Sequence, residues 1–151
     1  MKKIFKTIFD IIFIILIIIL SGYFILRLFG ITEIYKVKTG SMEDGIHPGD
    51  YILIVKKNSY NVGEIVTYKK DNYFVTHRII KKNGKKVITK GDANNVDDGE
   101  IQLNSIVGKV IYTGGILNFL IDFKFALSSG LLGLYLLSYY LDKDEETKKT
   151  K

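Results

Sequence analysis

One stretch of the chain organises the rest: Thr39-Gly40-Ser41-Met42-Glu43-Asp44-Gly45-Ile46-His47-Pro48-Gly49-Asp50. Its glycines and its proline are typical of a turn, and the apolar run 51–55 that follows is typical of a buried strand. The stretch begins about ten residues after a long apolar segment ends at residue 29. A serine held at the edge of an apolar sheet, close to a membrane, is a candidate nucleophile, and Ser41 is that serine.

Residues 8–29 are almost wholly apolar and predict a transmembrane anchor, because about 20 helical residues cross the hydrocarbon core. Lysines in residues 1–7 place the N-terminus on the cytoplasmic side. A cleaved signal peptide is the alternative, but its apolar core usually has about 7–15 residues and ends at a small-x-small site. Because this run is longer and no clean Ala-x-Ala pattern closes it, we expect the anchor to stay uncleaved.

A second apolar segment, residues 125–141, predicts another transmembrane helix, with an interfacial or core helix as the alternative. Residues 114–124 form a membrane-proximal segment, in which 116–123 can make a short amphipathic helix on the membrane. The charged segment 142–151 predicts a disordered tail, whose lysines favour the cytoplasm. We therefore expect an integral membrane protein with both termini in the cytoplasm.

Residues 30–113 predict an extracytoplasmic domain made mainly of β-strands, because short runs of β-branched and aromatic residues alternate with turn signals. The expected strands are 34–38, 51–55, 64–68, 73–80, 86–90 and 106–112, with a polar loop over 91–100. Asn83-Gly84 is the strongest hairpin signal, since both residues tolerate the positive φ of a type I′ turn. That turn would place His77 opposite Lys90.

Composition excludes several classes of function. The 151 residues carry a net charge of +6, but the lysines are scattered and form no basic stripe interleaved with aromatic residues. A nucleic-acid partner is therefore not expected. The chain has no cysteine, which excludes disulfides, thiolate metal sites and a cysteine nucleophile of the sortase kind.

A serine hydroxyl needs a base within hydrogen-bond reach, and the base works better when a third group orients it. Of the two histidines, His47 has the position of an exposed loop residue, whereas His77 lies in mid-strand and is either a core residue or the base. The predicted hairpin brings the acidic loop 91–98 beside His77, where neighbours across strands are about 5 Å apart. A calcium loop or a plain turn is the alternative, but EF-hand spacing is not met, so no metal or cofactor is expected.

Three blocks in this order resemble signal peptidase I of the endoplasmic-reticulum type, which also occurs in archaea and some Gram-positive bacteria. Residues 39–43 with 48–50 resemble the serine box, and Val75-Thr76-His77-Arg78 resembles the box in which this branch has histidine instead of lysine. Residues 90–98 resemble the acidic box. The resemblance covers residues 1–113.

The resemblance implies a signal-peptidase-like β fold and a serine endopeptidase that removes N-terminal signal peptides from exported preproteins. Ser41 would be the nucleophile, His77 the general base and then the acid, and Asp98 the orienting carboxylate. Asp92 matches the family's other important acidic position, and the predicted hairpin register favours it as the closer carboxylate, so both stay candidates. The Ser41 backbone N–H and the Thr39 hydroxyl would form the oxyanion hole.

Asp44 stands where the family often has proline, so the turn is expected to depend on Pro48 and the glycines. Ser-Lys chemistry with Lys90 as the base is an alternative. The implied partners are preproteins that bear signal peptides, the lipid bilayer and the export machinery. Two other functions stay open: a non-enzymatic, membrane-anchored β-domain that binds a partner, and a specialised regulatory peptidase of the same fold.

Overall fold

The computed structural model describes residues 2–149 of the chain, which form two compact units. One unit comprises residues 21–118, and the other comprises the residues up to 20 together with those from 119 onward. Helix α1 (Lys2–Leu28) runs through the boundary at residue 20, and helix α2 (Gly115–Asp122) runs through the boundary at residue 118.

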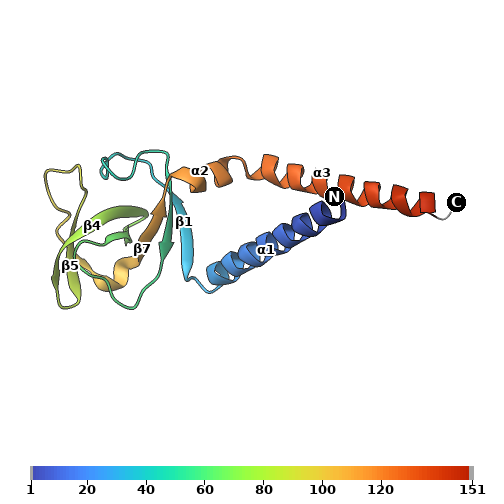
Figure 1. The fold of residues 1–151 in the computed structure, drawn as a ribbon. Coiled ribbons are helices and arrows are strands. Elements are labelled where there is room, and N and C mark those ends of the chain that lie inside the picture. The colour runs from blue at the N-terminus through green and yellow to red at the C-terminus, as the bar shows by residue number, and fades with distance from the viewer. Residues whose placement is uncertain (1, 150–151) are drawn as a thin grey trace. The chain divides into compact units, whose positions relative to one another are not determined.

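The unit of residues 21–118 is an antiparallel β half-barrel (Figure 1). Its seven strands lie side by side in the order β1-β2-β7-β3-β4-β5-β6. The strands are β1 (Thr32–Lys36), β2 (Tyr51–Val55), β3 (Ile65–Lys70), β4 (Tyr73–Asn83), β5 (Lys86–Lys90), β6 (Glu100–Gln102) and β7 (Ile106–Thr113). The prediction of a mainly β domain is confirmed, and each of the six expected strands is present.

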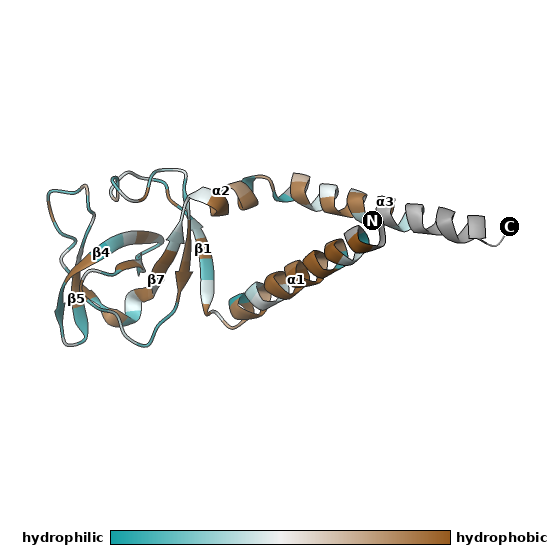
Figure 2. Cartoon of the chain, viewed as in Figure 1, coloured by the Kyte–Doolittle hydropathy of each residue, from teal (hydrophilic) through white to brown (hydrophobic). Residues whose placement is uncertain are grey.

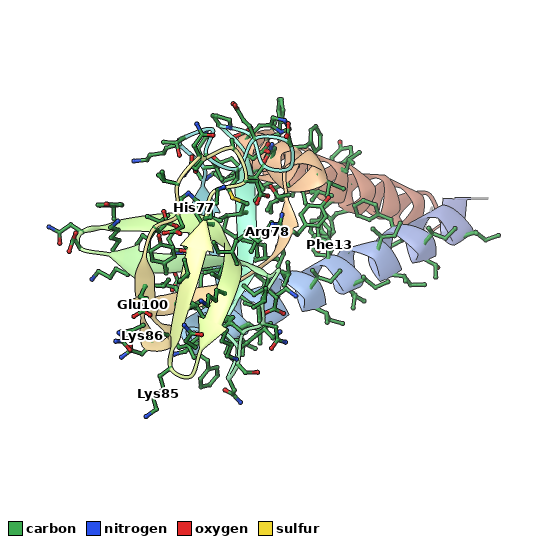
Figure 3. The ribbon with its side chains drawn as sticks, turned by 90° about the vertical axis from the view of Figure 1, so that its left-hand side faces the viewer. Phe13, His77, Arg78, Lys85, Lys86 and Glu100 are labelled. Carbon is green, nitrogen blue, oxygen red and sulfur yellow. The ribbon has the colours of Figure 1, made fainter. Side chains whose placement is uncertain are left out.

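Strand β6 was not predicted from the sequence. Its first residue, Glu100, was expected to end a polar loop over 91–100, so that boundary is wrong. Its three residues pair with β5, and a 3-10 turn over Leu103–Ser105 follows. The Lys86 ammonium lies 2.6 Å from the Glu100 carboxylate across the two strands (Figure 3). A three-residue strand is too short to show an alternating pattern, and its pairing with β5 is what defines it.

The hairpin of β4 and β5 has a different register from the predicted one. Asn83 pairs with Lys86, so Gly84 and Lys85 make the turn, and of these two only Gly84 has a positive φ, 56°. Glycine at the first turn position is typical of a type II′ turn rather than type I′. The register also shifts between Ile79 and Lys81, as a bulge does. Lys90 therefore lies opposite Arg78, and the predicted pairing with His77 is wrong.

Two buried apolar clusters hold the half-barrel together. The first consists of Tyr60, Val66, Tyr68, Ile79, Val87 and Ile106. The second consists of Ile52 and Ile54 from β2 with Met42 and Ile46, which come from the loop between β1 and β2. Each such side chain contributes about 1.5–3 kcal/mol when it is fully buried. The loop that carries Ser41 is thus part of the core.

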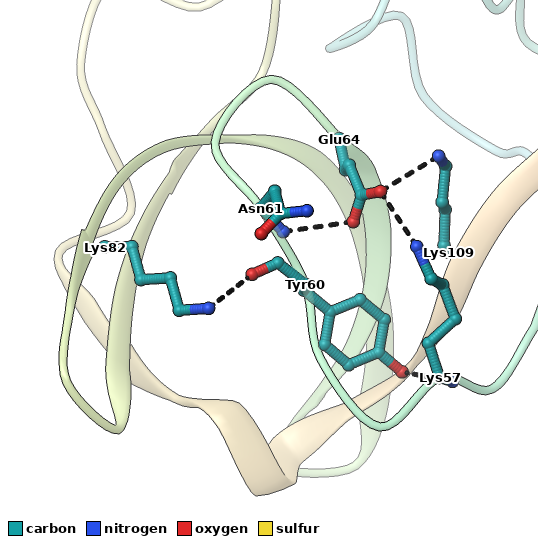
Figure 4. Close-up of polar contacts among 6 residues, drawn as sticks. All are labelled: Lys57, Tyr60, Asn61, Glu64, Lys82 and Lys109. Atoms are coloured by element: carbon teal, nitrogen blue, oxygen red, sulfur yellow. Dashed lines mark hydrogen bonds and ion pairs between the residues drawn. The ribbon is translucent and has the colours of Figure 1, made fainter.

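A charged cluster lies at the start of β3 (Figure 4). The Glu64 carboxylate accepts hydrogen bonds from the Lys57 and Lys109 ammonium groups at 3.0 Å each, and from the Asn61 backbone N–H at 3.1 Å (Figure 4). Partial burial opposes ionisation, but these bonds outweigh it and lower the pKa of Glu64 to about 2. Glu64 thereby ties the loop before β3 to β7.

The N-terminal helix α1 is apolar along most of its length (Figure 2). Its residues 6–28 are long and apolar enough to cross a membrane, and among the described residues it is the one helix that meets this criterion alone. Residues 115–122 and 126–136 meet the criterion only when they are taken together, with a bend of 69° between them. A second span at 125–141 therefore stays a prediction.

The C-terminal segment is helical. Residues 115–122 form α2, which confirms the expected short helix, although its place on a membrane stays a prediction. Helix α3 (Lys124–Lys149) continues through residues expected to be a disordered tail, so that expectation is wrong up to residue 149. Lysine and glutamate, which are common there, have high helix propensity. The last two residues of the expected tail lie outside the described residues.

Candidate active site

The loop between β1 and β2 is fixed by the two apolar side chains that follow Ser41. Met42 and Ile46 are only 2% and 1% exposed. The backbone N–H groups of Gly45 and Ile46 both donate to the Met42 carbonyl, at 3.2 and 3.0 Å. Because Met42 is anchored in the core, the neighbouring Ser41 has a defined position at the edge of the sheet.

Asp44 is the point where this loop departs from the expected proline-containing turn. Its φ is 94°, a value that proline cannot adopt because its ring fixes φ near −65°. Aspartate is among the few non-glycine residues that tolerate positive φ. The turn in this chain therefore has a backbone conformation at residue 44 that aspartate can adopt and proline cannot.

The end of the loop is tied to helix α2. The Asn118 side chain accepts a hydrogen bond from the Tyr51 N–H and donates one to Asp50 Oδ1, both at 2.7 Å. The other oxygen of Asp50 accepts from the His47 N–H at 2.9 Å. The bonds from the His47 backbone and from Asn118 lower the pKa of Asp50. His47 itself has an exposed side chain, as the sequence predicted.

Ser41, His77 and Asp98 come together although they are far apart in the sequence. His77 Nε2 lies 3.0 Å from Ser41 Oγ, and His77 Nδ1 lies 2.6 Å from Asp98 Oδ2. His77 projects from β4 (Figure 3) and is 6% exposed. A carboxylate only accepts hydrogen bonds, so Nδ1 carries the imidazole proton and Nε2 is free to accept the serine proton. This is the arrangement of a Ser-His-Asp triad.

Asp98 has a second partner that the sequence reasoning missed. The hydroxyl of Thr89, in β5, donates to the same Asp98 oxygen at 2.7 Å, and the Asp98 N–H donates to the Thr89 carbonyl at 2.9 Å. Thr89 is fully buried. The hydroxyl of Tyr68 lies close by, and burial, with the charge of Asp98 adding to it, raises the pKa of Tyr68 to about 12. A threonine in a strand is common, so nothing in the sequence marked this one.

Asp92 lies apart from the imidazole and pairs with Arg78. Its two oxygens accept hydrogen bonds from Arg78 Nε at 2.9 Å and from Arg78 Nη2 at 2.6 Å. A third bond joins Arg78 Nη1 to the Gly63 carbonyl at 2.9 Å. The guanidinium lowers the pKa of Asp92. Arg78 directly follows His77 in β4, and successive strand residues face opposite sides of a sheet, so the carboxylate that Arg78 holds lies away from the imidazole. The predicted register, which favoured Asp92 as the closer carboxylate, is therefore wrong.

The comparisons with known proteins agree with this geometry. The family described as Peptidase S24-like matches residues 31–111, which is more than half of the chain. The chain belongs to this family. It is 32% identical over 130 residues to signal peptidase complex catalytic subunit SEC11C of Canis lupus familiaris, which covers 70% of this chain and 67% of that protein.

Fungal relatives match a shorter part of this S24-like chain. The SEC11 subunit of Metarhizium acridum is 35% identical over 97 residues, which covers 53% of this chain and 56% of that protein. The SEC11 subunit of Chaetomium globosum is 40% identical over 79 residues, which covers 46% of each. The chain thus spans about half the length of these curated relatives.

Beside Ser41 the S24-like domain has a cleft of about 740 Å³. Residues 35–39 form one wall and residues 72–77 form the other. The rings of Tyr35 and Phe74 meet across it, with their centroids 4.8 Å apart. Within the described part of the chain, strand β1 pairs only with β2, and the β4 residues before Arg78 pair only with β3. Both walls therefore present an unpaired strand edge there.

The remaining predicted site residues are placed as follows. Thr39 lines the cleft together with Ser41. Lys90 lies in β5 opposite Arg78, whereas the nitrogen in contact with Ser41 Oγ is His77 Nε2. Among the described residues, no group of three or more His, Asp or Glu side chains is placed to hold a metal ion. The chemistry that this arrangement can perform is nucleophilic attack by Ser41, with His77 moving the proton.

Proposed function

We propose that this chain is a membrane-anchored serine endopeptidase that removes N-terminal signal peptides from preproteins. The observation that carries the proposal is the contact of Ser41 Oγ with His77 Nε2 at 3.0 Å, together with the Asp98 carboxylate 2.6 Å from the other imidazole nitrogen. Similarity to the catalytic subunits of signal peptidase complexes supports the choice of substrate.

In the proposed mechanism, Ser41 Oγ attacks the carbonyl carbon of the scissile bond while its proton passes to His77 Nε2. Asp98 stabilises the imidazolium that forms. The imidazolium then protonates the leaving amine, the C–N bond breaks, and an acyl ester remains on Ser41. Water, deprotonated by His77, hydrolyses the ester and restores the serine.

The Ser41 backbone N–H and the Thr39 hydroxyl are the proposed donors to the oxyanion. Both residues line the cleft from the same loop. Loss of one oxyanion donor costs about 10²–10³ in kcat where it has been measured. Asp92 is proposed to act indirectly, by holding Arg78, the residue after the base.

The shape of the cleft supports an extended peptide as the substrate. A peptide that lies between the edges of β1 and β4 can form main-chain hydrogen bonds with one or both, as peptides do when they add to a sheet. Apolar side chains dominate the lining, including those of Val37, Ile52 and Val75. Only small residues before the cut are proposed to fit, because the Tyr35 and Phe74 rings already meet across the space.

The membrane supplies the remaining part of the proposal. Helix α1 would anchor the chain with its N-terminus in the cytoplasm, and residues 30–113 would lie on the opposite side. The C-terminal helices would return the chain to the cytoplasm. Because the relatives are named as subunits of a complex, partner subunits and the export machinery are proposed interaction partners.

The test is cleavage of a preprotein by the full chain in detergent or lipid, with the new N-terminus read by mass spectrometry. Ser41→Ala and His77→Ala should abolish cleavage. His47→Ala is the matched control, because it removes the other histidine from an exposed position. Cleavage by Ser41→Ala at the wild-type rate would refute the mechanism. Stable capture of the preprotein without cleavage by the wild type would favour a binding module instead.

A further inference from the structure

The acidic loop of residues 91–98 contacts the nucleophile as well as the base. The Ala93 N–H donates to the Ser41 backbone carbonyl at 3.0 Å. The Asp92 N–H lies 3.5 Å from the sulfur of Met42, the residue after the nucleophile. Asp98, at the other end of the same loop, accepts from His77. One short segment therefore contacts both the backbone of the nucleophile and the side chain of the base.

Gly91 makes the closest part of this contact possible. A Cβ atom on Gly91 would lie 2.5 Å from the Ser41 carbonyl oxygen, which is inside the 3.0 Å below which something must shift. It would also lie 2.7 Å from the side-chain nitrogen of Asn94. The Asn94 amide can rotate away, whereas the Ser41 carbonyl is part of the backbone and is already bonded to Ala93.

The backbone angle of Gly91 does not explain a need for glycine here. Gly91 is not among the residues with positive φ, so an alanine would meet no conformational penalty of that kind. Gly91 is also buried, so a side chain could not turn into solvent. The demand for glycine at this position is therefore steric, and it comes from Ser41.

We propose that Gly91 is a positioning residue for the nucleophile: by lacking a side chain, it lets the acidic loop clamp the Ser41 carbonyl and so fixes the distance between Ser41 Oγ and His77 Nε2. The inference rests on the proposed function. The clamped carbonyl sets the orientation of the Ser41 Cα–Cβ bond, which aims Oγ at the imidazole. Asp98 holds that imidazole from the same loop, so moving the loop away from Ser41 moves the base away as well.

The experiment compares kcat and KM of the full chain for preprotein cleavage in wild type and Gly91→Ala. We expect kcat to fall about 10- to 100-fold, because displacements of an ångström or less at a reacting group have effects of this size. KM should change little, since Gly91 does not line the cleft. Gly45→Ala is the matched control: Gly45 lies in the serine loop, has ordinary φ and has open space where a Cβ would be. It should keep wild-type kcat.

A double variant identifies the atom that matters. If contact with the Ser41 carbonyl is the cause, Gly91→Ala/Asn94→Ala should stay as slow as Gly91→Ala. Recovery of kcat in the double variant would overturn the proposal, because it would assign the clash to the Asn94 side chain. Wild-type kcat in Gly91→Ala would overturn it too. Ser41→Ala is measured in parallel, and if it still cleaves, the proposed function fails rather than this inference alone.

Hydrogen exchange on the wild type tests the clamp without any variant, in case Gly91→Ala does not fold. The Ala93 amide should exchange slowly, because its hydrogen is bonded to the Ser41 carbonyl. Exchange of the Ala93 amide at the rate of an unstructured peptide would show that the loop does not hold Ser41 and would overturn the proposal.

Discussion

The hydroxyl of Thr89 offers a sharp test of how Asp98 supports the base. Thr89→Val replaces this hydroxyl with a methyl group of similar size at a fully buried position. The substitution removes the 2.7 Å hydrogen bond to Asp98 Oδ2 and leaves the 2.6 Å contact of the same oxygen with His77. Thr89→Ser is the complementary change, because it keeps the hydroxyl and removes the methyl.

The expected magnitudes differ between the two variants. A hydrogen bond to a charged group contributes about 1.5–3 kcal/mol, and each 1.36 kcal/mol in the barrier is about tenfold in rate. Because Asp98 keeps its contact with His77, we expect kcat of Thr89→Val to fall about tenfold. The lost hydrogen bond should also lower the stability of this variant by about 1.5–3 kcal/mol. Thr89→Ser should retain the rate but lose about 1 kcal/mol of stability from the missing buried methyl.

The assay is cleavage of a preprotein by each purified variant, together with thermal unfolding of the same samples in detergent. The reasoning requires that both variants lower the melting temperature and that only Thr89→Val lowers the rate. A Thr89→Val protein with wild-type kcat would refute it. Equal loss of rate in both variants would also refute it, because packing rather than the hydroxyl would then be responsible.

Three further predictions concern stability. Asp92→Asn should lower the melting temperature at pH 7, because Arg78 holds the pKa of Asp92 below its usual value. The difference from wild type should shrink as the pH falls below that usual value and the carboxylate is protonated; a difference that does not change with pH would contradict this. Glu64→Gln should cost about 1–3 kcal/mol at pH 7, and the cost should shrink as the pH falls from 4.5 towards the Glu64 pKa of about 2; urea unfolding at several pH values measures it. Asp44→Gly should stabilise the protein by about 1 kcal/mol, because glycine adopts the positive φ at this position without strain. Asp44→Pro should destabilise the protein, and a stabilising proline would show that the turn differs from the one described.

Local pattern predicted the strands well, because alternation and turn residues are properties of short segments. Residues 51–55 and 86–90 have the predicted bounds. Pairing was predicted less well, since the turn Gly84-Lys85 and the bulge near Ile80 depend on how two strands fit together. Strand β6 was missed for the same reason.

The site shows the same division. Ser41 and His77 were chosen from residue chemistry and from the order of the three boxes, and the structure places their side chains in contact. The choice between Asp92 and Asp98 depended on register, which the hairpin reasoning had wrong. Thr89 was not found, because its role depends on lying next to Asp98 and not on any pattern of its own.

The β domain depends on a residue that lies beyond its last strand, Asn118 in α2. Its amide occupies both the Tyr51 N–H and the Asp50 carboxylate, although the last strand ends earlier, at Thr113. A fragment truncated directly after that strand would lose both hydrogen bonds. The C-terminal end of the loop that bears Ser41 would then no longer be attached to α2. We expect such a fragment to be inactive because this loop is no longer held in place, and not because the lipid is missing. A soluble fragment should therefore retain all of α2.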